Sequence, residues 1–304
     1  MELAQAQEGF RAQLVSEGLL VRTGVDGLYG RSGVFEDIIE GIDRVVVAAG
    51  AEQRADRYRF SPVFPRADFD RTDYLASFPD LTGSIHTFVG SEREHADILA
   101  KHAEGGSWGD LLTQSEVMLA SAACHPAYPM LSGELPAGGR RLDIYGYCFR
   151  HEPSIDPARM QAFRQHEFVF VGPAADAVTH REYWVERGMD VLSRLRLPAA
   201  AEVANDPFFG RVGRMLAANQ REESLKVELV VHLYDGLGDG TAVVSCNCHL
   251  DHFGKNFEIY TNDGEVAHSA CVGFGMERLA LALLKHHGLD IAIWPASVRE
   301  ALWP

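Results

Sequence analysis

The sequence predicts an α+β fold in which helices flank an antiparallel sheet. Strand-like segments follow one another with short glycine-containing turns, and segments with helical spacing are segregated before and after them, which is typical of this class. The composition is that of a globular protein, with 46% hydrophobic and 23% charged residues. A chain of 304 residues can bury one large core. We therefore expect a single domain over residues 1–304.

The expected elements follow from the spacing of apolar residues. Residues 2–17 and 33–51 show helical spacing, and a turn-rich stretch at 24–33 separates them. The segment Tyr58 to Pro65 contains two prolines, which predicts a short strand at an edge or an interface. Further strands are expected at 141–150, 163–171, 226–234, 241–248 and 256–260. Further helices are expected at 181–195, 211–225 and 277–286.

Charge and cysteine content exclude several classes of protein. The net charge is -15, from 28 basic and 43 acidic residues, and this disfavours a partner held by many phosphate contacts, such as nucleic acid. The amino terminus lacks a basic start followed by an apolar run, and no stretch approaches about 18 consecutive apolar residues. We therefore expect a soluble cytoplasmic protein. An odd number of cysteines, five, disfavours a disulfide framework and leaves core packing or metal binding.

A strand end near the carboxyl terminus carries two glycines and an arginine in a pattern that suits ATP binding. Gly273 and Gly275 let the backbone approach a phosphate chain, and Arg278 follows in the first turn of the next helix. No acidic residue follows about 20 positions later, which disfavours a dinucleotide fold. Taken alone, this pattern is equally compatible with a plain strand-turn-helix joint.

A predicted hairpin supplies a second group of candidate nucleotide ligands. Phe149-Arg150-His151-Glu152 ends one strand, and a polar loop containing Arg159 precedes the next. Alternation in that next strand places Arg164 and Phe168 on one face, as a cation beside an aromatic platform. The alternative is a solvated hairpin with surface arginines.

In this order, Phe149-Arg150-x-Glu152, Arg164-x-x-x-Phe168 and Gly273-x-Gly275-x-x-Arg278 resemble motifs two and three of class II aminoacyl-tRNA synthetases. Pro62, after a long helix, resembles their dimer-forming first motif, which implies a homodimer. The segments 112–117 and 244–247 are similar to the amino-acid loop and a later strand of seryl-tRNA synthetases. The resemblance implies a class II synthetase-like antiparallel sheet flanked by helices.

The resemblance also implies roles for individual residues. Arg150 would hold the α-phosphate of ATP, with Glu152 beside the nucleotide or the amino acid. Phe168 would stack on adenine, and Arg278 would stack on its other face or hold the γ-phosphate. The residues implied to bind ATP with magnesium are Arg150, Arg159, Arg164, Phe168, Ser245, Gly273, Gly275 and Arg278. Those implied to bind the amino acid are Gln114, Glu116 and Asn247. The implied reaction is attack of an amino-acid carboxylate on the α-phosphorus, which releases pyrophosphate.

Cys124, Glu167 and Cys271 resemble the zinc ligands of methanogenic-type seryl-tRNA synthetases. Two thiolates and a carboxylate leave one coordination position open, which an amino group could fill. Strict alternation puts Glu167 on the face opposite Arg164 and Phe168, so this site is expected to need a twist or a bulge. The rival cluster is Cys246-x-Cys248-His249-x-x-His252, although burial of its cysteines as small apolar residues on a core strand is the favoured interpretation.

Departures from the seryl enzymes point to a narrower family. Only an extension of about 32 residues, 1–32, precedes the helix at which the resemblance to the seryl enzymes begins, so no tRNA-binding domain is expected. Ala242 stands where those enzymes have a metal-binding glutamate, which leaves the magnesium ligands open. Gly172 stands where a carboxylate contacts serine, which favours glycine or alanine without choosing between them.

The truncated core resembles the amino acid:[carrier protein] ligases. In that family the activated amino acid passes to the phosphopantetheine thiol of a small, acidic carrier protein. We expect a helical insertion at 205–226 to meet this partner through Arg211, Arg214 and Arg221, which share one helix side. A solvated face is the alternative. Two other functions remain open: a tRNA-aminoacylating seryl-type synthetase and a non-catalytic regulatory paralogue. The sequence does not identify the carrier protein or its pathway.

Overall fold

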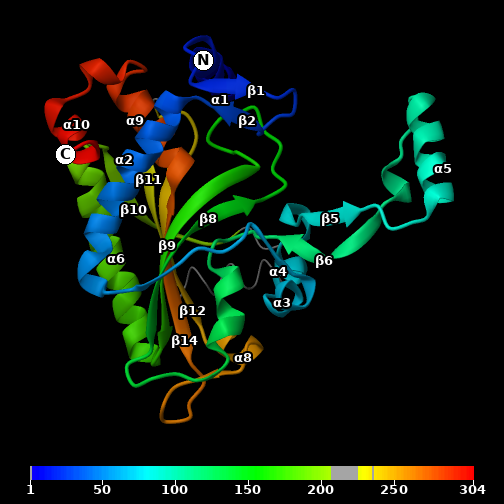
Figure 1. The fold of residues 1–304 in the computed structure, drawn as a ribbon. Coiled ribbons are helices and arrows are strands. Elements are labelled where there is room, and N and C mark those ends of the chain that lie inside the picture. The colour runs from blue at the N-terminus through cyan, green and yellow to red at the C-terminus, as the bar shows by residue number, and fades with distance from the viewer. Residues whose placement is uncertain (1, 207–224, 235) are drawn as a thin grey trace.

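A seven-stranded sheet forms the centre of the computed structural model, which describes residues 2–206, 225–234 and 236–304 (Figure 1). The strand order is β10-β11-β12-β14-β9-β8-β3. Neighbouring strands are antiparallel, except that the edge strand β3 runs parallel to β8. The strands are β3 (Asp56–Tyr58), β8 (Arg140–Phe149), β9 (Ala162–Gly172), β10 (Ala199–Ala204), β11 (Lys226–Val231), β12 (Thr241–Leu250) and β14 (His268–Gly275). The predicted α+β class with an antiparallel sheet is confirmed.

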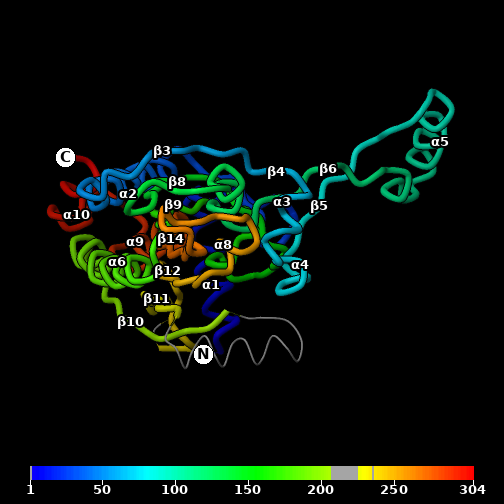
Figure 2. Tube along the Cα trace, turned by 90° about the horizontal axis from the view of Figure 1, so that it is seen from below, coloured from blue at the N-terminus to red at the C-terminus, as the bar shows by residue number. Residues whose placement is uncertain are grey.

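Long helices cover one face of this sheet (Figures 1 and 2). They are α2 (Gly33–Gly50), α6 (Ala174–Arg194), α9 (Met276–His287) and the shorter α10 (Ala296–Leu302). The main hydrophobic core lies between these helices and the sheet and includes Ile38, Trp184, Phe274 and Leu279, each fully buried. The spacing of apolar residues that predicts the helices is therefore the spacing of this buried face.

Shorter elements cover the opposite face. They are α3 (Arg66–Arg71), α4 (Tyr74–Ser77), α8 (His252–Asn256), the 3₁₀ helix η4 (His125–Leu131), and the small strands β4 (Val63–Pro65), β7 (Gly133–Glu134) and β13 (Ile259–Tyr260). The remaining 3₁₀ turns are Ala51–Gln53, Pro79–Leu81, Gly109–Leu111 and Ile291–Ile293. A second buried cluster, around Tyr128, Phe253 and Phe257, packs these elements on the sheet. This layer is thinner, and it leaves room for a cavity.

An arm extends away from the body in both views (Figures 1 and 2). It consists of β5 (Ser84–Thr87), α5 (Glu92–Ala103) and β6 (Thr113–Leu119), and β6 joins it to β4. No residue of α5 is buried. Residues 112–117, compared above with an amino-acid loop, therefore belong to this arm.

Most predicted element bounds agree with the structure, but the helix predicted at 181–195 begins earlier, at Ala174, and two predicted strands are divided. The segment Tyr58 to Pro65 is two strands, β3 and β4, because prolines interrupt the ladder. Residues 256–260 are the end of α8 followed by β13 rather than one strand. The expected helix at 211–225 falls almost wholly outside the described residues. Among the helices that are described, none combines the length and apolar character needed to traverse a lipid bilayer.

The amino-terminal segment packs against the domain. It contains α1 (Leu3–Ser16) and the hairpin β1 (Leu20–Arg22) and β2 (Tyr29–Arg31). Phe10 and Leu14 of α1 are buried in the main core. The segment is therefore part of the folded unit.

Candidate active site

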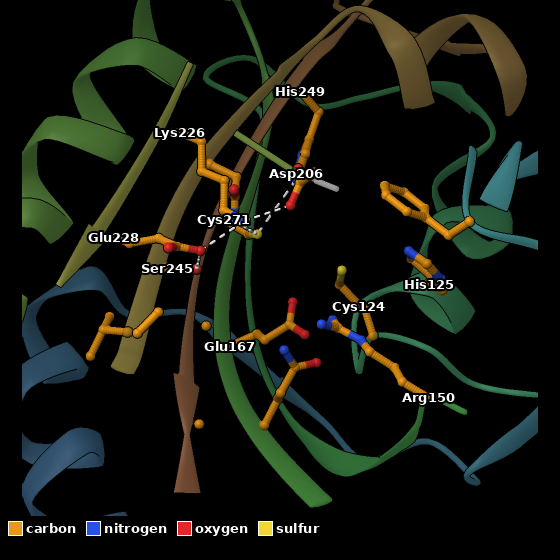
Figure 3. Close-up of a pocket in the computed structure, with 18 of the residues that line it drawn as sticks. Cys124, His125, Arg150, Glu167, Asp206, Lys226, Glu228, Ser245, His249 and Cys271 are labelled. Carbon is orange, nitrogen blue, oxygen red and sulfur yellow. Dashed lines mark hydrogen bonds and ion pairs between the residues drawn. The ribbon is translucent and has the colours of Figure 1, made fainter. Parts of the chain in front are cut away.

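A cavity of about 570 Å³ lies on the sheet face opposite the long helices (Figure 3). Because side chains alternate along a strand, β9 points Phe163, Gln165 and Glu167 into the cavity. The neighbouring strands contribute Cys271, Gly273 and Gly275 from β14, Ser245 and Asn247 from β12, and Lys226 and Glu228 from β11. Arg150, just after β8, and Arg278, in the first turn of α9, complete the wall.

Two guanidinium groups face this cavity in fixed positions. Arg150 donates from Nε to the Ser121 carbonyl at 3.0 Å and lies 5.4 Å from the centre of the Phe163 ring. Arg278 donates from Nε to the Ala158 carbonyl and from Nη1 to the Ala242 carbonyl, both at 2.9 Å. Within the described residues, neither guanidinium forms an ion pair with a carboxylate.

The electrostatic environment of Arg278 favours an anion. Burial and the positive charges of Arg150 and Arg159 lower the pKa of Arg278 from its ordinary value. A depressed arginine pKa means that the positive charge lacks compensation, and phosphate oxygens would supply it. The cluster is thus suited to a polyanionic ligand.

The structure corrects the prediction for Phe168. Phe168 and Arg164 do share a face, but this face is covered by the helices. Phe168 is 3% exposed and stacks on Trp184 and His166, with ring centres 4.5 and 5.1 Å apart. The aromatic ring that lines the cavity is Phe163, on the other face.

Arg164 also belongs to the buried interior rather than to the cavity. Its Nε donates to Glu277 at 2.8 Å, and its Nη2 donates to Glu36 at 2.9 Å. The side chain is 7% exposed. Arg164 therefore joins β9 to α9 and α2 and does not line the cavity as predicted.

Gln114 and Glu116 do not line the cavity either. Both lie exposed on β6 of the arm, and the Glu116 carboxylate pairs with Arg66 at 3.1 Å. Gly172 ends β9, five residues beyond Glu167, and it also lies outside the lining. The predicted link between Gly172 and a small amino acid has no support in this geometry.

The other predicted residues are at or beside the cavity. Glu152 lines it, and Arg159 is 58% exposed and 3.8 Å from Glu152. The Ser245 hydroxyl donates to Glu228 at 3.3 Å, and Asn247 Nδ2 donates to Cys271 Sγ at 3.8 Å. The predicted docking residues Arg211, Arg214 and Arg221 lie outside the described residues.

Cys124, Glu167 and Cys271 line the same cavity (Figure 3). Glu167 Oε1 accepts a hydrogen bond from the Ala123 amide at 2.9 Å, whereas its buried Oε2 has no partner in the described chain. Burial raises the pKa of Glu167 to about 7. Cys124 donates a hydrogen bond to Cys271, which lowers the pKa of Cys271 and raises that of Cys124. Alternation alone brings Glu167 to this site, so the predicted bulge is unnecessary.

The donor set matches zinc chemistry, but the side chains are not arranged as a preformed site. No three His, Cys, Asp or Glu side chains of the described residues form a group that could hold a metal ion. This holds for the rival cluster as well, in which Cys246 is fully buried under the helices. The unpartnered Glu167 oxygen and the thiols of Cys124 and Cys271 are donor types that zinc accepts.

Several residues of the cavity escaped sequence reasoning. Phe163 carries the same alternation signal as Glu167 and could have been found from it. Lys226, buried between Asp206 and Glu228, carries no motif signal. Sequence reasoning places His249 only in the rival cluster, but its Nε2 lies 3.6 Å from Cys271 Sγ. They reach the cavity only through strand order, which no local pattern specifies.

Comparison with known structures defines the class of the domain. The chain superposes on the M. kandleri SerRS, solved with A. aeolicus tRNASec, with a TM-score of 0.82 at 20% identity, covering 96% of this chain and 60% of that one. Seryl-tRNA synthetase of Pyrococcus horikoshii, complexed with ATP, gives a TM-score of 0.67 at 13% identity, covering 91% of this chain and 58% of that one. The domain thus has the class II synthetase fold.

Sequence comparison then shows the family. Two amino acid–[acyl-carrier-protein] ligases of Bradyrhizobium diazoefficiens are 41% and 39% identical over 290 residues, covering 95% of this chain and 86% and 88% of the relatives. A type-2 serine–tRNA ligase of Methanopyrus kandleri is 28% identical over 65% of this chain and 40% of its own length. No family model matches the chain. The chain belongs to the amino acid–[acyl-carrier-protein] ligase family.

Proposed function

We propose that this protein activates a small amino acid with ATP and transfers it to the phosphopantetheine thiol of an acyl carrier protein. The observation that carries the ATP step is the pair of guanidiniums, Arg150 and Arg278, which face one cavity without a carboxylate partner among the described residues. The two relatives at 41% and 39% identity are named for ligation of an amino acid to acyl carrier protein, which supports the second step.

The cavity suggests how each residue would contact ATP. Adenine would stack on Phe163, Arg150 would hold the α-phosphate, and Arg278 would hold the terminal phosphate. Gly273 and Gly275 leave space at the β14 end, since a Cβ at either position would meet no protein atom closer than 3.5 Å. An amino-acid carboxylate oxygen would bond to the α-phosphorus as the bridge to the β-phosphate breaks, forming the adenylate and releasing pyrophosphate.

Zinc is part of this proposal, with Cys124, Glu167 and Cys271 as its protein ligands. When bound, zinc supplies one open coordination position that accepts an amine. Glu167 is already oriented by the Ala123 amide, and His249 Nε2 lies 3.6 Å from Cys271 Sγ. These contacts would fix the ligands and so hold the amino acid at a set distance from Arg150.

Ala242 cannot supply the carboxylate that seryl enzymes use to bind magnesium, and we propose that Glu228 supplies it instead. Glu228 lies directly opposite Ser245 across β11 and β12, and both line the cavity. Carboxylate and hydroxyl oxygens suit magnesium, which keeps most of its ligands from water and phosphate. Glu228 and Ser245 would therefore hold the magnesium ion that accompanies ATP.

The amino-acid end of the cavity is crowded, which supports glycine or alanine as substrate. Asn247 contacts Cys271, and four rings that pack in pairs also line the cavity. The ring centres of His249 and Phe253 are 5.0 Å apart, and those of His125 and Tyr74 are 5.6 Å apart. Rings beside the amine site would disfavour an amino acid with a larger side chain.

The proposed partner is an acidic carrier protein held by Arg211, Arg214 and Arg221 of the segment 205–226. We also propose a cytoplasmic homodimer, in which the edge strand β3 and α2 lie near the contact. Reversing the charge at Arg211 and Arg214 should block transfer to the carrier protein and leave amino-acid activation intact. Equal loss of both steps would contradict docking at this segment.

Pyrophosphate exchange tests the proposal directly. Exchange between labelled pyrophosphate and ATP should require glycine or alanine in a panel of amino acids. Labelled amino acid should then pass to holo-carrier protein and not to tRNA. Absence of amino-acid-dependent exchange would contradict the proposal and favour a regulatory role, whereas charging of tRNA would favour a seryl-type synthetase.

A further inference from the structure

The loop 151–161, between β8 and β9, is held by the amino-terminal segment, residues 2–32. The Gln161 amide donates to the Gly27 carbonyl at 2.8 Å, and its side chain donates to the Asp26 carbonyl at 2.8 Å. The Gln161 carbonyl in turn accepts from the Arg150 amide at 2.9 Å. Gly27 has φ of +78°, and a Cβ there would lie 3.2 Å from the Arg159 carbonyl oxygen. This close approach requires glycine.

A second path joins α1 to Arg278. Asp156, in the same loop, is 6% exposed and accepts from Gln7 Nε2 of α1 at 3.2 Å, from the Tyr234 hydroxyl, and from the Ala158 amide at 2.9 Å. The Ala158 carbonyl accepts from Arg278 Nε at 2.9 Å. Three donors fix a buried carboxylate tightly, because charge-assisted hydrogen bonds are strong.

Helix α1 and the turn that follows it, where both sets of contacts begin, are themselves well packed. Phe10 of α1 is 3% exposed and meets the Tyr234 ring edge-on, with centres 6.5 Å apart. Arg11, also on α1, donates to Asp26 at 2.8 Å. Helix, turn and loop thus form one packed unit, and a functional group supported by such a unit stays in place.

We infer that the amino-terminal segment positions the two ATP-binding guanidiniums. It holds the loop 151–161 in place before ATP binds, so Gln7, Asp156 and Tyr234 are positioning residues that act through Arg278. Donors fixed in advance need no reorganisation when charge develops on the phosphates. The inference rests on the proposed function, in which Arg278 contacts ATP.

The test compares one matched pair of variants, Gln7→Ala and Gln13→Ala, and a third variant, Tyr234→Phe. Gln7→Ala removes one donor to Asp156, and Gln13→Ala makes the same change on the exposed side of α1. Tyr234→Phe removes a second donor and keeps the ring. We expect Tyr234→Phe to weaken ATP binding about tenfold and Gln7→Ala severalfold, with the KM for the amino acid, kcat and the melting temperature nearly unchanged. Gln13→Ala should match the wild type.

A double-mutant cycle separates positioning from a merely structural role. In an Arg278→Lys background, Gln7→Ala should change ATP affinity, measured by calorimetry, by less than about twofold, because its path through Arg278 is lost. An equal effect in both backgrounds overturns the inference, as does a lower melting temperature with ATP affinity intact. If Arg278→Lys alone leaves ATP affinity unchanged, the proposed function itself fails, and the inference fails with it.

Discussion

Alanine substitution at Phe163 and Phe168 should separate nucleotide binding from stability, because the two rings face opposite sides of β9. Phe168 is 3% exposed, and its ring centre lies 4.5 Å from that of Trp184. Removal of such a ring costs about 3–5 kcal/mol, a large part of the roughly 5–15 kcal/mol that stabilises a typical domain. At about 2 °C per kcal/mol for a chain of this size, the melting temperature should fall by roughly 6–10 °C.

Phe163→Ala should weaken ATP binding and leave the melting temperature nearly unchanged. The ring is half-buried and lines the cavity, so its loss affects packing less. Stacking of a base on an aromatic ring contributes about 1–3 kcal/mol, which corresponds to ATP binding weakened by roughly 5- to 150-fold. Phe163→Tyr keeps the stacking surface and should bind ATP nearly as the wild type does.

Thermal melting and calorimetric titration with ATP measure both quantities on the same preparations. The reasoning is refuted if Phe168→Ala melts as the wild type does but binds ATP poorly. It is equally refuted if Phe163→Ala keeps wild-type ATP affinity. The first result would mean that adenine meets the helix-covered face of β9, and the second would mean that Phe163 does not stack on adenine.

Three further outcomes are expected. Cys271→Ser should abolish bound zinc, measured by mass spectrometry of the purified protein, together with adenylate formation; retained metal with full activity would contradict the zinc proposal. Burial lowers the pKa of His180 from 6.5 to about 4, so protonation favours the unfolded chain. The free energy of unfolding should therefore drop by about 3 kcal/mol as the pH falls from 6.5 to below 4. Urea titrations at several pH values should show a smaller drop for His180→Gln, and an equal drop in both proteins would count against this. Light scattering should give twice the chain mass of 33.5 kDa, and a monomer would exclude the proposed dimer.

The helices and the sheet of this domain were largely predictable, because each buries a continuous face. Residues 33–51 carry the apolar spacing that packs α2 on the core, and the predicted strands match those of the sheet within a few residues. Prolines in the segment Tyr58 to Pro65 predicted an edge, and β3 is the edge strand. These features depend on local periodicity, which the sequence contains.

The face of β9 that meets the ligand was not predictable in the same way. Alternation correctly separates Glu167 from Phe168, but it cannot say which set faces the helices. The same applies to Gln114 and Glu116, since their sequence context does not reveal that β6 leaves the body as an arm. Long-range packing decides such choices, and no local pattern encodes it.

The described residues on either side of the segment 207–224 lie at neighbouring points of the sheet. Ala204 of β10 lies opposite Lys226 of β11, and the Lys226 ammonium contacts Asp206 just before the segment. A gene lacking this segment could therefore join the two strands by a tight hairpin turn and keep the strand order. Such a shortened protein would show whether amino-acid activation continues without the segment that is proposed to bind the carrier protein.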